Sequence, residues 1–334
     1  MKAGRLMRSL DSANATSNVS RRRPAFVLCL GIALTGLLLT LASCGIGGEV
    51  SLPDPTVTVP PPTPTPAVPS IPAPTLLLSS SDKGEAFLEN FSTGQVYLAD
   101  NAEHQMAMAS TTKIMTAVVA MSYGKLDQQI TVGSDASAAA IKKNCACDAS
   151  VAGLAQGETL PLGELLYGLL LPSGDDAAVA IGDGVAGSSD HFVALMNLEA
   201  TFLGLRNTHY VNANGLDADG HYTTAHDLAI LTASAMNFPT FKQIVDTPSH
   251  TYGRHAWTNT NELLSGQPYA YTGAFGVKTG NTENAGYCLV FAAQRSQGTL
   301  VGVVLGEKGY FDRFTDAKKL LDWGFAIEAQ QQGG

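Results

Sequence analysis

Positive charge is scarce through most of this 334-residue sequence. The chain has 20 Lys and Arg residues against 29 Asp and Glu, a formal net charge of −9. Six of the basic residues fall within residues 1–43, which hold one acid, so the rest has 14 basic and 28 acidic residues, a net of −14. Nucleic-acid binding depends on a basic face that neutralises phosphates. The sequence therefore argues against a nucleic-acid partner.

Motifs of two other classes of site are also missing. Seven histidines are present but no G-x-S-x-G elbow, which disfavours a Ser-His-Asp hydrolase. Asn212, Asn214, Asp217 and Asp219 are spaced roughly like a calcium loop, but no glutamate follows at the required distance, so a polar turn is the better interpretation. We expect neither a metal ion nor an organic cofactor.

The first 43 residues have the pattern of an export signal. Three arginines, Arg21–Arg23, precede an uncharged run rich in Leu, Ala and Gly at residues 25–42. The run ends in Leu41-Ala42-Ser43-Cys44, which resembles a bacterial lipobox and implies that Cys44 is the lipidated first residue of the mature protein. The alternative is an uncleaved membrane anchor, because the run is nearly long enough to span a bilayer. Both interpretations place the body outside the cytoplasm, tethered to the outer face of the bacterial cell membrane.

Residues 44–75 are predicted to be a linker rather than a folded domain. Ten prolines lie between Pro53 and Pro74. Such a segment cannot build a packed core and adopts an extended helix of about 3.1 Å per residue. We expect a spacer here, followed by one folded domain at residues 76–330.

The cysteines of the folded part suggest a loop disulfide and a core position. Cys145 and Cys147 form a C-x-C pair in a polar stretch. An exported protein can oxidise such a pair, although so small a ring is labile, and two thiols alone do not make a zinc site. Cys288 lies in an apolar run and is interpreted as a small core residue.

Hydrophobic patterns predict strands at both ends of the folded part and helices between them. Strands are expected at 85–90, 95–98, 287–293 and 299–305, helices at 114–121, 165–170, 191–205 and 224–236, and a last amphipathic helix at 312–326. One sheet built from both ends, with helices packed on it and a helical insertion, satisfies this order. A site between the sheet edge and the helical part is then expected.

Three short motifs carry the chemistry. Ser110-Thr111-Thr112-Lys113 stands at a helix start, where positions i and i+3 share a face, so the lysine can contact the serine hydroxyl and act as its base. Ser173-Gly174-Asp175 follows a helix end, and Lys278-Thr279-Gly280 precedes the strand expected at 287–293. Each motif is common alone. In this order they resemble the S-x-x-K, S-D-N and K-T-G set of penicillin-binding proteins and β-lactamases.

With these motifs, residues 80–326 resemble D-alanyl-D-alanine carboxypeptidases of the low-molecular-mass penicillin-binding class. Other stretches that resemble the family are Gly157-Glu158, Asn212–Leu216, His221–Ala225 and Ala285–Val290. The resemblance implies an α/β (α+β) fold of the serine β-lactamase and penicillin-binding transpeptidase kind: an antiparallel sheet flanked by helices, plus a helical subdomain. It also implies hydrolysis of the terminal D-alanine from peptidoglycan stem peptides, with β-lactam antibiotics as covalent inhibitors.

The resemblance assigns roles to the motif residues. Ser110 is implied as the nucleophile that forms an acyl-enzyme, Lys113 as the base that takes its proton, and Ser173 as the relay of a proton to the leaving D-alanine nitrogen.

For substrate binding, the resemblance implies that Lys278 and Thr279 hold the terminal carboxylate. It implies further that the backbone N–H groups of Ser110 and Asn281 form the oxyanion hole.

Asp175 departs from the family pattern, which usually has asparagine at this position. An ionised carboxylate cannot donate to a substrate carbonyl, and pairing with Lys113 or Lys278 would hold that lysine protonated. The departure favours one alternative, a weakly active or non-catalytic relative that binds cell-wall peptides. A serine β-lactamase is the other alternative, but no Glu-x-x-Leu-Asn stretch follows Ser173. The oligomeric state is not predicted.

Overall fold

The structure is a computed structural model, and it describes residues 71–80, 84–145 and 149–333. These residues belong to one compact unit of the chain. The expectations for the export signal, Cys44, most of the linker and Cys147 lie outside the described residues. No helix among the described residues is both long and apolar enough to cross a membrane.

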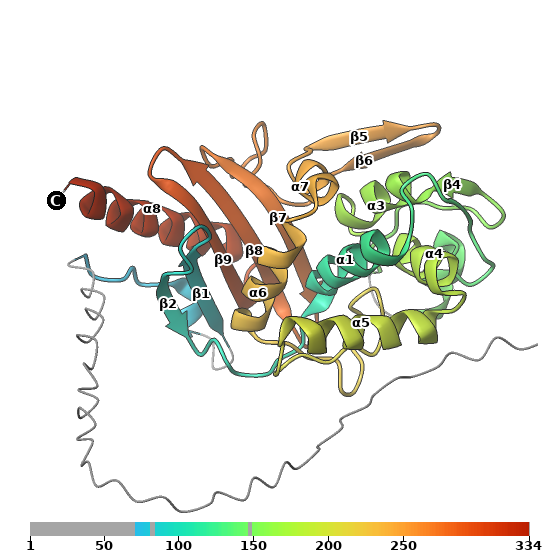
Figure 1. The fold of residues 1–334 in the computed structure, drawn as a ribbon, viewed down its shortest axis with the longest axis horizontal. Coiled ribbons are helices and arrows are strands. Elements are labelled where there is room, and N and C mark those ends of the chain that lie inside the picture. Colours follow the sequence, from blue (N-terminus) through green and yellow to red (C-terminus); the bar gives the residue numbers. More distant parts are fainter. Residues whose placement is uncertain (1–70, 81–83, 146–148, 334) are drawn as a thin grey trace, which may run out of the picture. The chain divides into compact units, whose positions relative to one another are not determined.

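A five-stranded antiparallel sheet is assembled from the two ends of the folded part, as predicted (Figure 1). Its order is β2-β1-β9-β8-β7. The strands are β1 (Glu85–Asn90), β2 (Val96–Asp100), β7 (Ala274–Thr282), β8 (Gly286–Arg295) and β9 (Gly298–Glu307). Val303 of β9 pairs with Phe87 of β1 and with Val290 of β8, which joins the early and late strands.

The sheet is covered on both faces. Residues 288–293 of β8 are all buried, as expected for a strand with apolar packing on both sides. On one face lies α8 (Asp312–Gly333), where Phe314, Leu320 and Leu321 pack against alternate residues of β8 and β9. On the other lies α6 (Ala225–Ala235), part of the larger core. Helix α8 is longer than the helix expected at 312–326 and continues for almost two more turns.

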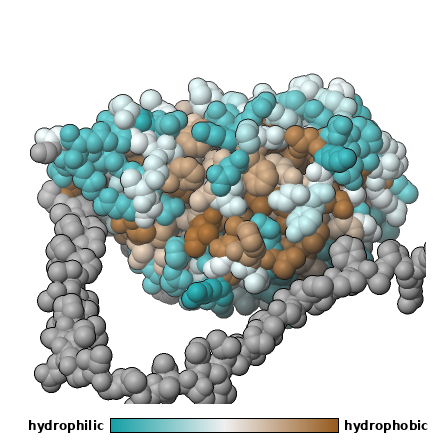
Figure 2. All heavy atoms as spheres, viewed as in Figure 1, coloured by the Kyte–Doolittle hydropathy of each residue, from teal (hydrophilic) through white to brown (hydrophobic). Residues whose placement is uncertain are grey.

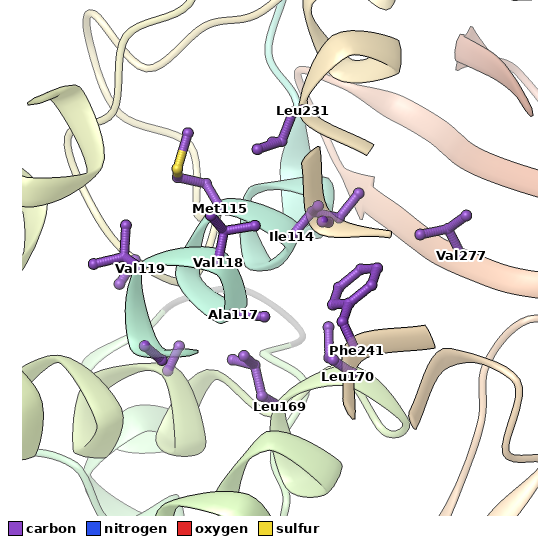
Figure 3. Close-up of a cluster of buried hydrophobic side chains, with 14 of the residues drawn as sticks. Ile114, Met115, Ala117, Val118, Val119, Leu169, Leu170, Leu231, Phe241 and Val277 are labelled. Atoms are coloured by element: carbon purple, nitrogen blue, oxygen red, sulfur yellow. The ribbon is translucent and has the colours of Figure 1, made fainter. Parts of the chain in front are cut away.

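The helical part is built around one buried helix. The short helix η2 (Ala109–Thr112) leads into α1 (Lys113–Tyr123), whose residues 113–120 are all buried. Ile114 and Val118 lie among side chains such as Leu169 and Phe241 of the surrounding helices (Figure 3). The helical part consists further of α2 (Ala138–Asn144), α3 (Leu162–Leu170), α4 (Asp175–Ala186), α5 (Ser189–Leu203) and α7 (Pro239–Val245). Helices α3, α4 and α5 pack directly on α1, as does α6.

Helix α5 packs on one side only. It buries Phe192, Met196 and Ala200, a stripe at i, i+4 and i+8. Leu198 and Phe202 on its other side are 58% and 83% exposed. Figure 2 shows apolar atoms gathered across the middle of the face on which α5 lies in Figure 1.

The sequence did not predict every strand. Two small two-stranded sheets lie beside the helical part. Strand β3 (Gln129–Thr131) pairs with β4 (Thr159–Pro161) across a long connection that contains α2, and β5 (Ser249–Tyr252) forms a hairpin with β6 (His255–Thr258). Strand β7 was missed as well: Lys278-Thr279-Gly280 was taken to precede a strand but lies inside one.

The first described residues are fixed along α8. Trp323 Nε1 donates to the Ile71 carbonyl at 3.1 Å, Lys319 Nζ to the Thr75 carbonyl at 3.0 Å, and Leu78 N to Asp316 Oδ2 at 3.0 Å. Leu78 itself is 2% exposed in the core under α8. This segment is therefore an integral part of the folded unit.

Candidate active site

The first motif turns sharply before the helix that follows it. Ala109 has φ +49°, which is uncommon for a residue with a Cβ, and Ser110 comes next as the second residue of η2. Lys113 begins α1, and its Nζ lies 2.7 Å from Ser110 Oγ. Ser110 is half-buried, whereas Lys113 is completely buried. The motif thus presents a hydroxyl to the surface with an amine directly beneath it.

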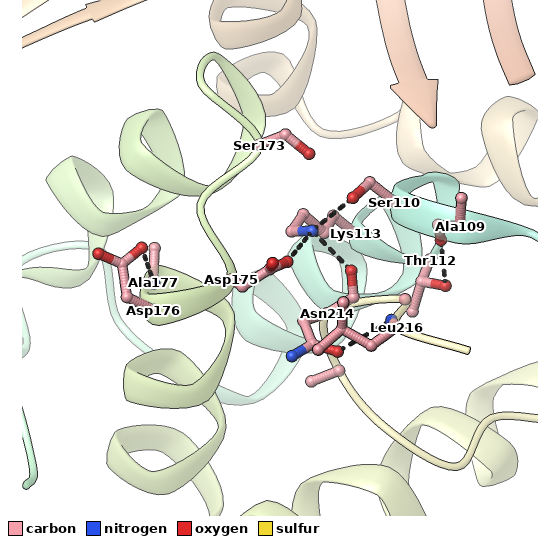
Figure 4. A network of polar contacts seen from close by, with 12 residues as sticks. Ala109, Ser110, Thr112, Lys113, Ser173, Asp175, Asp176, Ala177, Asn214 and Leu216 are labelled. Carbon is pink, nitrogen blue, oxygen red and sulfur yellow. Dashed lines mark hydrogen bonds and ion pairs between the residues drawn. The ribbon is translucent and has the colours of Figure 1, made fainter. Parts of the chain in front are cut away.

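Lys113 has three oxygen partners (Figure 4). Besides Ser110 Oγ, its Nζ lies 2.7 Å from Asp175 Oδ1 and 2.6 Å from the Asn214 carbonyl. An ammonium group would donate to all three. A neutral amine would donate to the carboxylate and the carbonyl, which only accept, and would turn its lone pair to the Ser110 hydroxyl. The geometry accommodates both protonation states.

The second lysine is held in a separate network. Lys278 Nζ lies 2.9 Å from Ser173 Oγ and 2.9 Å from the Thr279 carbonyl, and Lys278 is 1% exposed. Burial, followed by the positive charges of Lys113 and Arg313, holds the pKa of Lys278 well below its usual value, with Asp175 acting in the opposite direction. No carboxylate among the described residues is within 4 Å of this amine. An anionic ligand would supply the missing charge.

Ser173 lies in the connection between α3 and α4, with φ +62°. Hydrogen bonds between the start of α4 and residues 150–154 hold this connection in place. Asp175 N donates to the Ser150 carbonyl at 2.8 Å. The buried Asp176 carboxylate accepts backbone N–H groups of Ala152, Gly153 and Leu154 at 2.7 to 2.9 Å. Consecutive aspartates thus have different tasks: Asp175 reaches Lys113, and Asp176 anchors the neighbouring loop.

Strand β7 forms the side of the site that belongs to the sheet, and it is an edge strand of that sheet. Thr279 Oγ1 lies 2.6 Å from Thr260 Oγ1, and Arg313 Nη1 donates to the Gly280 carbonyl at 2.9 Å. Asn281 follows at an exposed position. Because an edge strand leaves backbone groups without strand partners, this wall can pair with an extended peptide.

Between β7 and the helical part is a groove of about 1100 Å³, lined by Ser110, Asp175, Asn281, Gly215 and Glu283 among others. Cys145 also lines it and is disulfide-bonded, and the partner cysteine is outside the described residues. Cys288 is a free, fully buried cysteine, and its position confirms the interpretation as a core residue.

The turn at 212–217 closes one end of the site. Asn212 Oδ1 accepts from Gly215 N at 2.7 Å and Asn214 Oδ1 from Leu216 N at 3.1 Å, so both side chains stabilise the turn itself. Asp217 Oδ1 accepts from Thr282 Oγ1 at 2.7 Å, which connects the turn to the end of β7.

The structure brings the predicted residues together in two groups: Ser110, Lys113 and Asp175 in one, and Ser173, Lys278 and Thr279 in the other. Sequence reasoning missed the Asn214 carbonyl and Arg313. The stretch Asn212–Leu216 was noticed as a polar turn and as a family resemblance, but neither pointed to the Asn214 carbonyl, because a backbone carbonyl leaves no signal in the sequence.

The comparisons with known proteins agree with this geometry. The family model for D-alanyl-D-alanine carboxypeptidases of peptidase family S11 matches residues 77–309. The D-alanyl-D-alanine carboxypeptidase of Streptomyces sp. strain K15 is 38% identical over 256 residues, covering 71% of this chain and 85% of that protein. DacA of Escherichia coli K12 is 36% identical over 268 residues, covering 78% of this chain and 62% of DacA, so the match spans less than two thirds of that relative.

Solved structures give the same result. The crystal structure of the Streptomyces K15 DD-transpeptidase has a TM-score of 0.69 and 37% identity, covering 77% of this chain and all of that one. Penicillin-binding protein 5 from Haemophilus influenzae has a TM-score of 0.69 and 30% identity, covering 77% and 73%. The predicted fold class is confirmed. The chain belongs to the D-alanyl-D-alanine carboxypeptidase family of serine peptidases.

Proposed function

We propose that this protein removes the terminal D-alanine from peptidoglycan stem pentapeptides through an acyl-enzyme on Ser110. The observation that carries the proposal is the contact between Ser110 Oγ and Lys113 Nζ at 2.7 Å, with the hydroxyl at the groove and the amine buried. The catalytic domain would be residues 76–330.

In the first step, Ser110 Oγ attacks the carbonyl carbon of the penultimate D-alanine, and its proton passes to the lone pair of neutral Lys113. The C–N bond to the last D-alanine then breaks, and the leaving nitrogen takes a proton through Ser173. Water attacks the ester and releases the shortened peptide and Ser110. The proton taken from Ser110 leaves on the amine of D-alanine, and a proton of the attacking water restores the Ser110 hydroxyl.

The substrate carboxylate would bind at Lys278 and Thr279. Lys278 is a buried amine without a facing carboxylate among the described residues, so an arriving carboxylate gains a charge-assisted hydrogen bond and favours the ammonium form. The Thr279 hydroxyl, now 2.6 Å from Thr260 Oγ1, can redirect its proton to the ligand.

The oxyanion would be stabilised by the backbone N–H groups of Ser110 and Asn281. Ser110 is the second residue of η2, where a helix leaves its N–H without an intrahelical acceptor. Removing one donor of an oxyanion hole typically costs 10²- to 10³-fold in rate. A β-lactam would acylate Ser110 in the same way because its ring carboxylate and amide imitate the dipeptide.

Membership of the family indicates where the protein acts but not how it is attached there. Enzymes of this family act at the cell wall, outside the cytoplasm. We propose in addition that residues 1–43 are a signal peptide and that a lipid on Cys44 attaches the protein to the outer face of the membrane; the uncleaved anchor is the alternative. Palmitate labelling in cells, lost in Cys44→Ser, tests this proposal.

The activity is tested with a fluorescent penicillin and with D-alanine release from a stem pentapeptide. We expect slow, stable labelling of the wild type and measurable release, both abolished in Ser110→Ala with the thermal midpoint retained. Absence of label on the folded wild type would overturn the proposal and favour a second candidate, a peptide-binding relative with little turnover. The Lys113–Asp175 ion pair is the observation in favour of that candidate. Rapid nitrocefin hydrolysis would indicate a β-lactamase instead.

A further inference from the structure

The carbonyl immediately before the nucleophile has two close neighbours. Thr112 Oγ1 donates to the Ala109 carbonyl at 2.8 Å, within the turn in which Ala109 has φ +49°. Gly215 lies so close to the same oxygen that a Cβ there would be 2.0 Å from it. The Ala109 carbonyl therefore has little freedom to rotate.

A buried histidine fixes the direction of the Thr112 hydroxyl. Val211 N–H donates to His221 Nδ1 at 3.0 Å, so this nitrogen carries no proton. The proton of the neutral ring is then on Nε2, which lies 2.9 Å from Thr112 Oγ1 and donates to it. Because Oγ1 accepts from His221, its own proton is left for the Ala109 carbonyl. Burial lowers the pKa of His221 to about 4, which keeps the ring neutral near pH 7.

The Ala109 carbonyl and the Ser110 N–H belong to the same peptide unit. A trans peptide is planar, and its C=O and N–H point in opposite directions. Holding the oxygen against Thr112 therefore directs the Ser110 N–H away from Thr112. If the Ala109 oxygen were released, this N–H would rotate with it.

We propose that Thr112 and His221 are positioning residues for the oxyanion hole: the relay from His221 through Thr112 to the Ala109 carbonyl sets the direction of the Ser110 N–H. The inference rests on the proposed function, because it assumes that this N–H stabilises the tetrahedral intermediate. Neither side chain contacts the substrate or the reacting atoms.

The experiment separates acylation from binding. Stopped-flow acylation by a fluorescent penicillin gives the dissociation constant of the initial complex and the acylation rate constant. In Thr112→Val we expect the rate constant to fall about 10- to 100-fold, with the dissociation constant within threefold of wild type. Affinity for a peptidyl boronic acid, whose tetrahedral adduct places an oxygen in the hole, should fall by a similar factor.

Three further single variants and one double variant distinguish positioning from loss of stability. Thr112→Ser keeps the hydroxyl and should restore acylation to within threefold of wild type. Thr232→Val is the matched control, since it removes a buried hydroxyl that donates to the Leu228 carbonyl at 2.7 Å, away from the groove. It should lower the thermal midpoint without slowing acylation. His221→Phe should slow acylation, and the double variant with Thr112→Val should be no slower than the slower single variant, because the two groups act in series.

Several results would overturn the inference. These are a Thr112→Val rate constant within threefold of wild type, a Thr112→Ser variant as slow as Thr112→Val, equal slowing in Thr232→Val, or additive losses in the double variant. If the wild type is not acylated at all, the proposed function fails first, so the two failures are distinguishable.

Discussion

Replacing Asp175 with asparagine removes the carboxylate that pairs with the proposed base. Lys113 Nζ and Asp175 Oδ1 are 2.7 Å apart, and their side chains are 0% and 4% exposed. At an effective dielectric constant of about 20, two unit charges at that distance attract by about 6 kcal/mol. Desolvation offsets much of this attraction, and a lysine that is paired with Asp175 as an ammonium cannot accept the Ser110 proton.

In Asp175→Asn the side chain keeps an oxygen that accepts from Lys113 and gains an N–H that can donate to a substrate carbonyl. The Lys113 amine then no longer faces this carboxylate, so the proton transfer from Ser110 to Lys113 should not be slowed. We expect acylation by a fluorescent penicillin and D-alanine release at pH 7 to stay the same or become faster.

The control is Asp183→Asn, which removes one negative charge from the same helix. Asp183 accepts from Ser189 Oγ at 2.9 Å and makes no contact with Lys113. Its pH–rate profile should match the wild type. A more than tenfold loss of acylation in Asp175→Asn, about 1.4 kcal/mol in barrier, would refute the reasoning and show that the carboxylate is needed.

Three other predictions concern stability and the turn at the nucleophile. Burial raises the pKa of Glu85 to about 8, so the folded state binds the extra proton and stability is lost as pH rises from about 4.5 to 8; Glu85→Gln should reduce that loss in urea unfolding at pH 5 and 8, and an unchanged slope would contradict this cause. The lowered pKa of Lys278 has the opposite sign, since the unfolded state binds more protons below pH 10.5; the contribution of Lys278 to stability should rise with pH toward that value, so the stability gain of Lys278→Met over the wild type should shrink as pH rises in the same assay, while the variant loses D-alanine release. Gly215→Ala would bring a Cβ to 2.0 Å from the Ala109 oxygen at φ +92° and should abolish penicillin labelling, whereas Gly253→Ala, whose Cβ meets nothing within 4 Å, should label normally.

The sequence predicted what depends on local geometry. Ser110 and Lys113 are one helical turn apart, so their contact follows from the spacing alone. The contact of Lys278 with Ser173 spans 105 residues; the family resemblance implied roles for both residues in one site but did not predict the contact. Whether Asp175 would pair with Lys113 or Lys278 depended on the packing of α4 against α1, which no local pattern encodes.

Strand β7 was not predicted because of its composition. It contains two glycines and a lysine, which are poor strand formers and conceal the pattern. Packing favours glycine at 280, since a Cβ there would lie 3.1 Å from the Ala109 side chain, a tight contact to which the neighbour would have to adjust. The support from His221 to Thr112 was hidden for a different reason, because the two residues are 109 positions apart.

The attachment of residues 71–78 along α8 has a mechanical consequence. Ile71, Thr75 and Leu78 meet residues 323, 319 and 316, so the segment runs antiparallel to the helix and each contact lies about one turn from the next. Tension that reaches the folded unit along the chain before Ile71 is resisted first by these hydrogen bonds, one after another, and by the buried Leu78. Strand β1, which lies between β2 and β9 in the sheet, bears the tension only after these hydrogen bonds have broken. In a cell-wall enzyme pulled from its amino-terminal side, we therefore expect residues 71–78 to detach from α8 before the groove deforms.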